Sequence, residues 1–280
     1  MLDDLVGIGM RPAHYEQLTN SPVDIGWLEV HSENHFEINS EATYYLDKAS
    51  ERYPISLHGV GLALSSHELL DTIHIHNIKK LVDRYQPFSV SEHLGWSSIA
   101  GLHYSDSSPI PYTEENLKHV IGRVQQVQQI LGQAIAIENP ACYSKNKNNT
   151  LTEAVFLTEL QTATNCKILL DINNVHISSH QLDFNPYDYL TSIPSHIVSE
   201  LHLSGSNKQL KDNRITFDQE HGQKVTPEVW RLFEYFLQHC NTIPTLIEWD
   251  TNIPQLGELL REAYTAQKMI LKSQRFKNAC

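Results

Sequence analysis

Residues that could bind a metal ion gather in the stretch Lys167–His176. A short apolar run ends there and gives way to four polar residues, Asp171, Asn173, Asn174 and His176. A buried strand that ends in an acid, two amides and an imidazole is costly unless these groups find partners. A metal ion is a common partner for an acid and a histidine. A capped loop after a core strand explains this stretch equally well, so the rest of the chain has to decide.

The same succession of an apolar run and a polar donor recurs along the chain. The donors that follow apolar runs are Glu33, His58, His93, Glu138, Asp171, His202 and Glu248. His176 and His221 come from adjoining loops. A single histidine after a strand is more often a hydrogen-bonded structural residue. Several carboxylates in one cleft would repel one another and take up protons, and metal ions would remove that conflict.

The apolar runs are predicted strands that alternate with predicted helices. The eight runs are Leu5–Met10, Trp27–His31, Pro54–Leu57, Phe88–Val90, Ala134–Ile137, Ile168–Leu170, Ile197–Leu201 and Thr245–Ile247. Such alternation predicts a parallel sheet, and eight units in this length favour a closed (β/α)₈ TIM barrel in one domain, 1–280. Because the carboxyl ends of barrel strands meet at one mouth, the donors are expected to lie together.

Capping residues predict where several helices begin. Ser65 or Ser66 is expected to cap a helix that runs to about Tyr85, and Thr113 is expected to start the next one. Thr150, three residues before a glutamate, resembles a capping box.

Composition narrows the classes of function. The 280 residues carry a formal net charge of -12 and show no Lys/Arg cluster, which argues against nucleic-acid binding as the main task. Four cysteines without CxxC spacing indicate reduced thiols. No apolar run approaches membrane-spanning length, and Asp3 and Asp4 stand where a signal peptide would be basic. We expect a cytoplasmic protein without a membrane or nucleic-acid partner.

Histidines and acids together make a nitrogen and oxygen donor set. This set suits iron, manganese or zinc and lacks the thiolates of a structural zinc site. So many donors could hold more than one ion, and Glu138 could bridge two of them. These residues are compatible with an oxidase, a two-metal hydrolase or sugar isomerase, or a non-catalytic metal-binding scaffold.

Seven short motifs occur in a fixed order along the chain. They are Gly7-Ile8-Gly9-Met10-Arg11-Pro12, Ser56-Leu57-His58-Gly59-Val60-Gly61, Ser91-Glu92-His93-Leu94, Ile137-Glu138-Asn139, Asp171-Ile172-Asn173-Asn174, Glu200-Leu201-His202-Leu203-Ser204-Gly205 and Ile247-Glu248-Trp249-Asp250. Together they resemble the multinuclear non-haem iron-dependent oxidative enzymes, which include the iron subunit of methanobactin biosynthesis. The resemblance spans the chain from Gly7 to about Pro254.

This resemblance implies a xylose-isomerase-like TIM barrel that holds two or three iron ions. It implies oxidation of a ribosomally made peptide, usually at cysteine, with molecular oxygen as co-substrate and a partner protein that presents the peptide. Carried over by motif, the iron ligands would be His58, His93, Glu138, Asp171, His176, His202, His221 and Glu248. Glu138, Asp171 and His202 would be the catalytic residues among them. Residues expected to support these ligands or face the substrate are Glu33, Asn139, Asn174 and Asp250.

The chain departs from the family beside His221. Relatives usually place an acid two residues before this histidine, where this chain has Gln219. An amide brings no charge and is a poorer ligand for a hard cation, unless Asp218 or Glu220 takes its place. We therefore expect two well-occupied metal positions and a weaker third near His176 and His221.

Two predicted loops are long, Ser98–Pro111 and Ser204–Val225. Loops of this length are often functional, and loops build the mouth of a TIM barrel. The peptide or its presenting protein is expected to dock over them.

Overall fold

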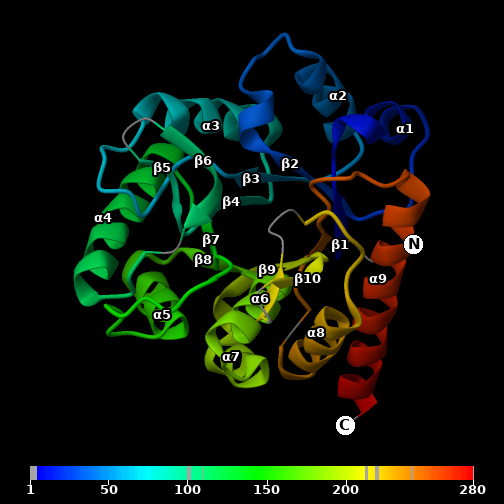
Figure 1. Ribbon diagram of the computed structural model, residues 1–280. Helices are drawn as coiled ribbons and strands as arrows, with labels where there is room; N and C mark the ends of the chain where they lie inside the picture. Colours follow the sequence, from blue (N-terminus) through cyan, green and yellow to red (C-terminus); the bar gives the residue numbers. More distant parts are fainter. Residues whose placement is uncertain are drawn as a thin grey trace.

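Eight parallel strands close into a barrel in the order β1-β12-β9-β8-β7-β4-β3-β2 (Figure 1). Their bounds in the computed structural model are β1 Val6–Gly9, β2 Trp27–His31, β3 Ile55–Gly59, β4 Ser89–His93, β7 Ala136–Glu138, β8 Lys167–Asp171, β9 Val198–Leu203 and β12 Thr245–Ile247. The structure describes residues 5–99, 102–108, 110–211, 214–217, 221–240 and 242–279. The predicted (β/α)₈ barrel is confirmed, and each predicted strand overlaps one of its strands.

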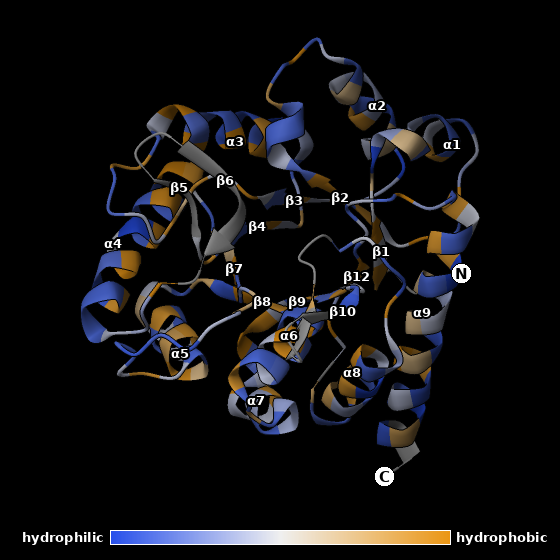
Figure 2. Ribbon diagram, viewed as in Figure 1, coloured by the Kyte–Doolittle hydropathy of each residue, from blue (hydrophilic) through white to orange (hydrophobic). Residues whose placement is uncertain are grey.

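Helices surround the barrel and connect its strands (Figure 1). They are α1 Tyr15–Asn20, α2 Glu41–Ser50, α3 Thr72–Tyr85, α4 Glu114–Leu131, α5 Glu153–Thr164, α6 Ile172–Leu182, α7 Pro186–Ser192, α8 Pro227–His239 and α9 Leu256–Ala279. Hydrophobic and hydrophilic residues alternate along these helices (Figure 2), as expected where one face packs on the sheet. Among the residues that the structure describes, no helix is both long and apolar enough to cross a membrane.

Alternation along the strands separates an apolar outer face from a polar interior. Residues two apart in a strand point to the same side. In β2, Leu28 and Val30 belong to the hydrophobic core under the helices, whereas Glu29 lies against His202 of β9 inside the barrel. Branched apolar side chains usually fill the interior of a TIM barrel, so this polar interior needs an explanation.

Two predicted helix starts are wrong. Helix α3 begins at Thr72 rather than near Ser65, because the Asp71 carboxylate accepts hydrogen bonds from the amides of Ile73 and His74. Helix α5 is capped by Thr152 rather than Thr150. Ser, Thr and Asp all cap helices, so residue type alone does not choose among neighbours. The start of α4 after Thr113 is confirmed.

Each of the two long predicted loops contains a two-stranded antiparallel ribbon. Strands β5 Trp96–Ile99 and β6 Leu102–Ser108 pair after β4, and β10 Lys208–Lys211 pairs with β11 Arg214–Phe217 after β9. Both ribbons follow the carboxyl end of a barrel strand, which is the end where TIM-barrel enzymes build their sites.

Candidate metal centre

Strand register pairs several of the predicted donors, and places His31, which was not predicted, beside one of them. His31 of β2 is paired with His58 of β3, and His93 of β4 with Glu138 of β7. Asp171 of β8 is paired with His202 of β9. The strands are short and end at these positions, so their side chains converge at the carboxyl end of the barrel.

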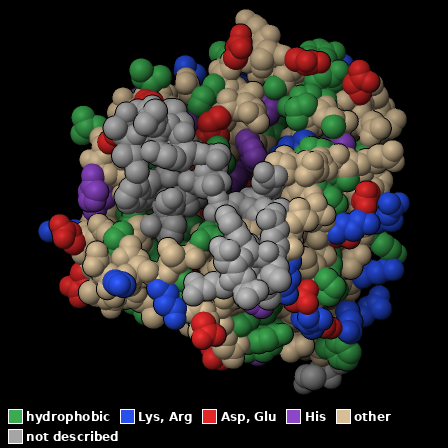
Figure 3. All heavy atoms as spheres, viewed as in Figure 1, with side chains coloured by type: hydrophobic (Ala, Val, Ile, Leu, Met, Phe, Trp, Pro, Cys, Tyr) green, Lys and Arg blue, Asp and Glu red, His purple; other side chains and the backbone are tan. Residues whose placement is uncertain are grey.

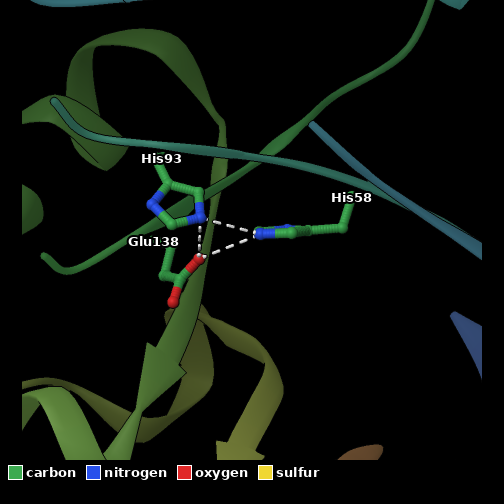
Figure 4. A group of neighbouring side chains, drawn as sticks. All are labelled: His58, His93 and Glu138. Atoms are coloured by element: carbon green, nitrogen blue, oxygen red, sulfur yellow. Dashed lines mark hydrogen bonds and ion pairs between the residues drawn. The ribbon is translucent and has the colours of Figure 1, made fainter. Parts of the chain in front are cut away.

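His58, His93 and Glu138 form a tight triangle of donor atoms (Figure 4). The two histidine Nε2 atoms lie 2.9 Å apart, and Glu138 Oε2 lies 3.3 Å from His58 Nε2 and 3.2 Å from His93 Nε2. Ligand atoms about 2.1 Å from one cation lie about 3.0–3.4 Å from one another in tetrahedral or octahedral geometry. The triangle therefore has the dimensions of one metal coordination shell.

The surroundings of His58 favour a neutral ring whose Nε2 carries a lone pair. His58 Nδ1 lies 2.8 Å from the Ser91 hydroxyl, and that hydroxyl lies 3.5 Å from the carbonyl oxygen of Leu57. A ring that donates from Nδ1 leaves Nε2 free to bind metal. Burial lowers the pKa of His58 well below its ordinary value and lowers that of His93 to about 4. Both rings are thus neutral at physiological pH, as metal ligation requires.

Glu138 also belongs to a second group of donors, with Asp171 and His202. Glu248 extends this group, because its Oε2 lies 3.6 Å from His202 Nδ1 and 3.4 Å from His221 Nδ1. Glu138 is therefore the one residue that these two groups share.

His221 is held in an uncommon backbone conformation. Its φ of 40° lies in the left-handed region, which costs a residue with a side chain free energy. Its Nδ1 lies 2.5 Å from the Ser204 hydroxyl. The surrounding structure therefore fixes this ring beside Glu248.

Buried polar atoms at this centre lack hydrogen-bond partners. The atoms are Glu29 Oε1 and Oε2, Glu138 Oε2, Asp171 Oδ2, His202 Nδ1 and Nε2, and Glu248 Oε2. Each such atom costs free energy unless a cation or a proton satisfies it. Burial raises the pKa of Glu138 well above its ordinary value and that of Asp171 to about 6. The donor set, imidazole nitrogens and carboxylate oxygens, fits iron as well as manganese or zinc.

Two residues that the sequence analysis missed stand behind His202. Glu29 Oε2 lies 3.1 Å from His202 Nε2, and Glu200 Oε1 lies 3.6 Å from the same nitrogen. Although burial opposes the shift, Glu29 and Glu248 raise the pKa of His202 well above its ordinary value. Glu29 and Glu200 each precede a histidine by two residues in a strand, so strand alternation could have revealed them.

Arg11 was also missed, because it appeared only as part of the first motif and was given no role. Its guanidinium lies 2.5 Å from Asp250 Oδ1, 3.0 Å from His31 Nε2 and 3.6 Å from Glu29 Oε1. A Cβ atom at Gly9 would lie 2.8 Å from the centre of this guanidinium. The glycine therefore leaves room for a buried arginine that fixes Asp250.

Asn139 and Asn174 are buried supports of the ligands. The Asn139 side chain accepts a hydrogen bond from the Asp171 amide and donates one to the Asp171 carbonyl, at 2.8 and 3.1 Å. The Asn174 side-chain amide donates to the Asn139 carbonyl at 3.0 Å and lies 3.4 Å from Glu138 Oε1. Of the two roles expected for these residues, this geometry favours support of Glu138 and Asp171.

Two predicted residues stand apart from these groups. His176 lies on α6, and its ring packs on His180 and Phe217, with centroids 4.8 and 5.4 Å away. Glu33 pairs with His74 instead, at 3.1 Å. Gln219, with its neighbours Asp218 and Glu220, lies outside the described residues, so the weaker third metal position stays a prediction.

The centre has a fully buried floor and a partly exposed rim. Glu29 and His202 are fully buried, whereas the side chains of His93 and Asp250 are 25% and 23% exposed. Histidine side chains are visible near the middle of this face of the molecule (Figure 3). The rim residues are therefore open to solvent, whereas the floor residues are not.

Comparison with known sequences identifies the family. The profile of the RiPP precursor modification enzymes MbnB/TglH/ChrH matches residues 5–271. The chain belongs to this family. Its members modify precursors of RiPPs, which are ribosomally made peptides altered after synthesis, so the family implies an enzyme with a peptide substrate. The resemblance found in the seven motifs is thereby confirmed.

The names of two similar proteins state no activity. The chain is 41% identical over 267 residues to a UPF0276 protein of Vibrio parahaemolyticus, covering 95% of this chain and 92% of the relative. It is also 41% identical over 260 residues to a UPF0276 protein of Acaryochloris marina, covering 93% and 92%.

Solved structures confirm the xylose-isomerase-like barrel. A D-psicose 3-epimerase from Clostridium cellulolyticum aligns with a TM-score of 0.57 at 12% identity, covering 98% of both chains. Endonuclease IV from Thermus thermophilus aligns with a TM-score of 0.60 at 12% identity, covering 94% of this chain and 99% of that one. At such low identity these likenesses show the fold alone.

Proposed function

We propose that this protein is a multinuclear non-haem iron enzyme that oxidises a ribosomally made peptide at cysteine, with molecular oxygen as co-substrate. Membership in this family supports the peptide substrate. One observation carries the metal part of the proposal: buried donor atoms that lack hydrogen-bond partners converge around Glu138. When bound, iron supplies one-electron chemistry with oxygen, which the side chains of the protein cannot provide.

Two sets of side chains would hold the iron ions. His58 and His93 form the first set, and Asp171, His202, His221 and Glu248 form the second, with Glu138 shared. Ser91 keeps His58 in the tautomer that presents Nε2, and Asn139 holds the backbone that carries Asp171. Such supporting contacts orient ligands and tune a metal ion.

Residues at the rim would bind and orient the peptide. Asp250 and His31 are partly exposed, and both are held by Arg11. We place Asp250 among the substrate-facing groups, because it combines a fixed carboxylate with access from the mouth. A cysteine is the favoured target, since a coordinated thiol loses its proton outright and is held in place for reaction.

The test is turnover of a precursor peptide by the iron-loaded protein, followed by mass spectrometry with and without oxygen. We expect a mass change on the cysteine-containing peptide that requires oxygen and disappears when cysteine is replaced by serine. Modification that proceeds equally without oxygen would refute the oxidase and favour hydrolysis or isomerisation by two metal ions. Iron loading without any peptide turnover would leave only a metal-binding scaffold.

We further propose that the peptide, or a partner protein that presents it, docks over the β5–β6 and β10–β11 ribbons. Both ribbons follow strands that carry predicted ligands, His93 on β4 and His202 on β9. Replacing either ribbon by a short glycine-containing turn should weaken peptide binding at least tenfold and leave the iron content unchanged. Unchanged binding after both replacements would place the docking surface elsewhere.

A further inference from the structure

A second group of metal-binding side chains lies outside the barrel interior. It consists of Glu33 in the short helix η2 (Ser32–His35), His74 in the first turn of α3 and Glu92 of β4. We call it the outer triad. One donor atom from each residue lies within 4.8 Å of the other two. Glu92 precedes His93 in its strand, so alternation directs it to the opposite face of the sheet from the interior centre.

One pair of atoms in the outer triad has the same spacing as the donor atoms of the interior centre. His74 Nε2 lies 3.1 Å from Glu33 Oε1, yet this nitrogen and Glu33 Oε2 are buried atoms without a hydrogen-bond partner. That distance falls in the range of about 3.0–3.4 Å expected for two ligands of one cation. The nitrogen and the carboxylate oxygen are therefore close enough to bind the same cation.

Backbone amides fix both carboxylates of the outer triad. Glu33 Oε1 accepts a hydrogen bond from the Val60 amide at 3.0 Å. Glu92 accepts one from the His93 amide at 3.0 Å and one from the Leu62 amide at 3.3 Å. Each carboxylate oxygen has more than one lone pair, so these bonds orient the acids and still leave acceptor capacity for a cation.

Two glycines let the backbone pass close to the outer triad. A Cβ atom at Gly59 would lie 2.5 Å from Glu92 Oε2, and one at Gly61 would lie 2.6 Å from His74 Cε1 and 3.0 Å from Glu33 Oε1. The segment from Gly59 to Leu62 therefore wraps around the acids, which makes the site enclosed and preformed.

We propose that the outer triad binds one divalent transition-metal ion, separate from the interior centre. Glu92 is buried and Glu33 is partly exposed, and two carboxylates within 4.8 Å of each other repel unless a cation or a proton lies between them. One imidazole with two carboxylates suits Zn²⁺, Mn²⁺ or Fe²⁺. The side chains of Glu33 and His74 are 24% and 14% exposed, so an ion can enter from solvent.

The ion has a structural task next to the interior centre. It joins η2, the start of α3 and strand β4, and it fastens the segment that begins at Gly59. His58 precedes that glycine, and His93 follows Glu92, so the outer ion stiffens the backbone on which two interior ligands sit. The outer triad would bind this ion whatever the interior centre catalyses.

Zinc is the probe for the test. Crystals of the iron-loaded protein are soaked in Zn²⁺, and anomalous data are collected above and below the zinc absorption edge. We expect a zinc peak between Glu33, His74 and Glu92 in the wild type and in the control His76→Ala, whose ring is exposed and lies near the Thr72 carbonyl. His74→Ala should lack this peak. A wild-type crystal without it would overturn the proposal.

Zinc stoichiometry in solution provides the second measurement. The wild type and His76→Ala should each hold one more tightly bound Zn²⁺ per chain than His74→Ala and the near-isosteric Glu33→Gln, with equal iron content in all four. Equal zinc content in all four proteins would show that the outer triad is only an ion pair and would overturn the proposal.

Discussion

Two glutamates of this protein show how a carboxylate proposed to bind metal differs from one held by hydrogen bonds. Glu153 at the start of α5 receives the hydroxyls of Tyr112 and Tyr189, each at 2.5 Å. Glu138 in the barrel interior is buried, whereas Glu153 is partly buried, and Glu138 Oε2 faces two histidine nitrogens without a hydrogen bond. Burial raises the pKa of both carboxyls.

The difference lies in which groups satisfy the oxygens. Hydroxyl protons satisfy Glu153, and this network forms part of the wall of a cavity of about 1100 Å³ beside α5 and α7. Burial and the nearby Glu153 also raise the pKa of the Cys142 thiol, so this cysteine stays protonated and unreactive. Glu138 Oε2 has no such hydrogen bond and needs a cation or a proton, so the partners of a carboxylate indicate its function better than its burial does.

Glu138→Gln should give the largest effect, because the amide removes the negative charge that faces the ring nitrogens of His58 and His93. We expect iron content to fall at least tenfold and turnover to be lost, while circular dichroism shows a folded barrel. The matched control is Glu153→Gln, which makes the same substitution at a hydrogen-bonded carboxyl and should keep full iron content. Equal iron in both variants would break the comparison.

Glu29→Gln should give the next largest effect. Glu29 is not among the predicted metal ligands, but its Oε2 lies 3.1 Å from Nε2 of the predicted ligand His202. Loss of such a supporting carboxylate costs about 10- to 100-fold in metal affinity in other proteins. Iron affinity measured by competition with a chelator should fall by that order, and an unchanged affinity would remove Glu29 from the centre.

Ser91→Ala should give a smaller effect on the same centre. It removes the hydroxyl that faces His58 Nδ1 and so frees the ring to change tautomer. The lost hydrogen bond is worth about 1 kcal/mol, or about a fivefold loss of iron affinity. A loss as large as that of Glu138→Gln would mean that Ser91 does more than orient the ring.

Glu153→Gln should change only the pH dependence of stability. Burial raises the folded-state pKa of Glu153, against the opposing hydrogen bonds of Tyr112 and Tyr189. Its protonated form therefore stabilises the fold below the ordinary carboxyl pKa, and this contribution is lost as pH rises through the folded value. In urea unfolding of the metal-free protein, the variant should gain stability relative to wild type from pH 5 to 8. A difference that stays constant with pH would contradict this account.

The barrel and most of the donors that meet at its carboxyl end were predictable from the sequence, because both follow from where the apolar runs end. An apolar run followed by His58, His93 or Asp171 indicates a strand and a donor at its carboxyl end. Glu29 and Glu200 were missed because the search began after each strand, whereas they lie inside strands, two residues before a histidine. The outer triad was missed because Glu92 is the outward neighbour of His93.

Other features depend on contacts that sequence patterns do not carry. The β5–β6 and β10–β11 ribbons were predicted as loops, since their sequences lack the apolar runs from which the barrel strands were predicted. His176 was expected at the centre from its motif, but α6 turns its ring toward His180 and Phe217. Which face of a helix meets which neighbour is set by packing rather than by spacing to Asp171.

An anomalous difference map at the iron absorption edge tests the central claim most directly. For the wild type purified in air, we predict two strong peaks inside the barrel. One should contact His58 and His93, the other Asp171 and His202, with Glu138 between them. A barrel interior without iron, or with a single iron that does not contact Glu138, would contradict the account.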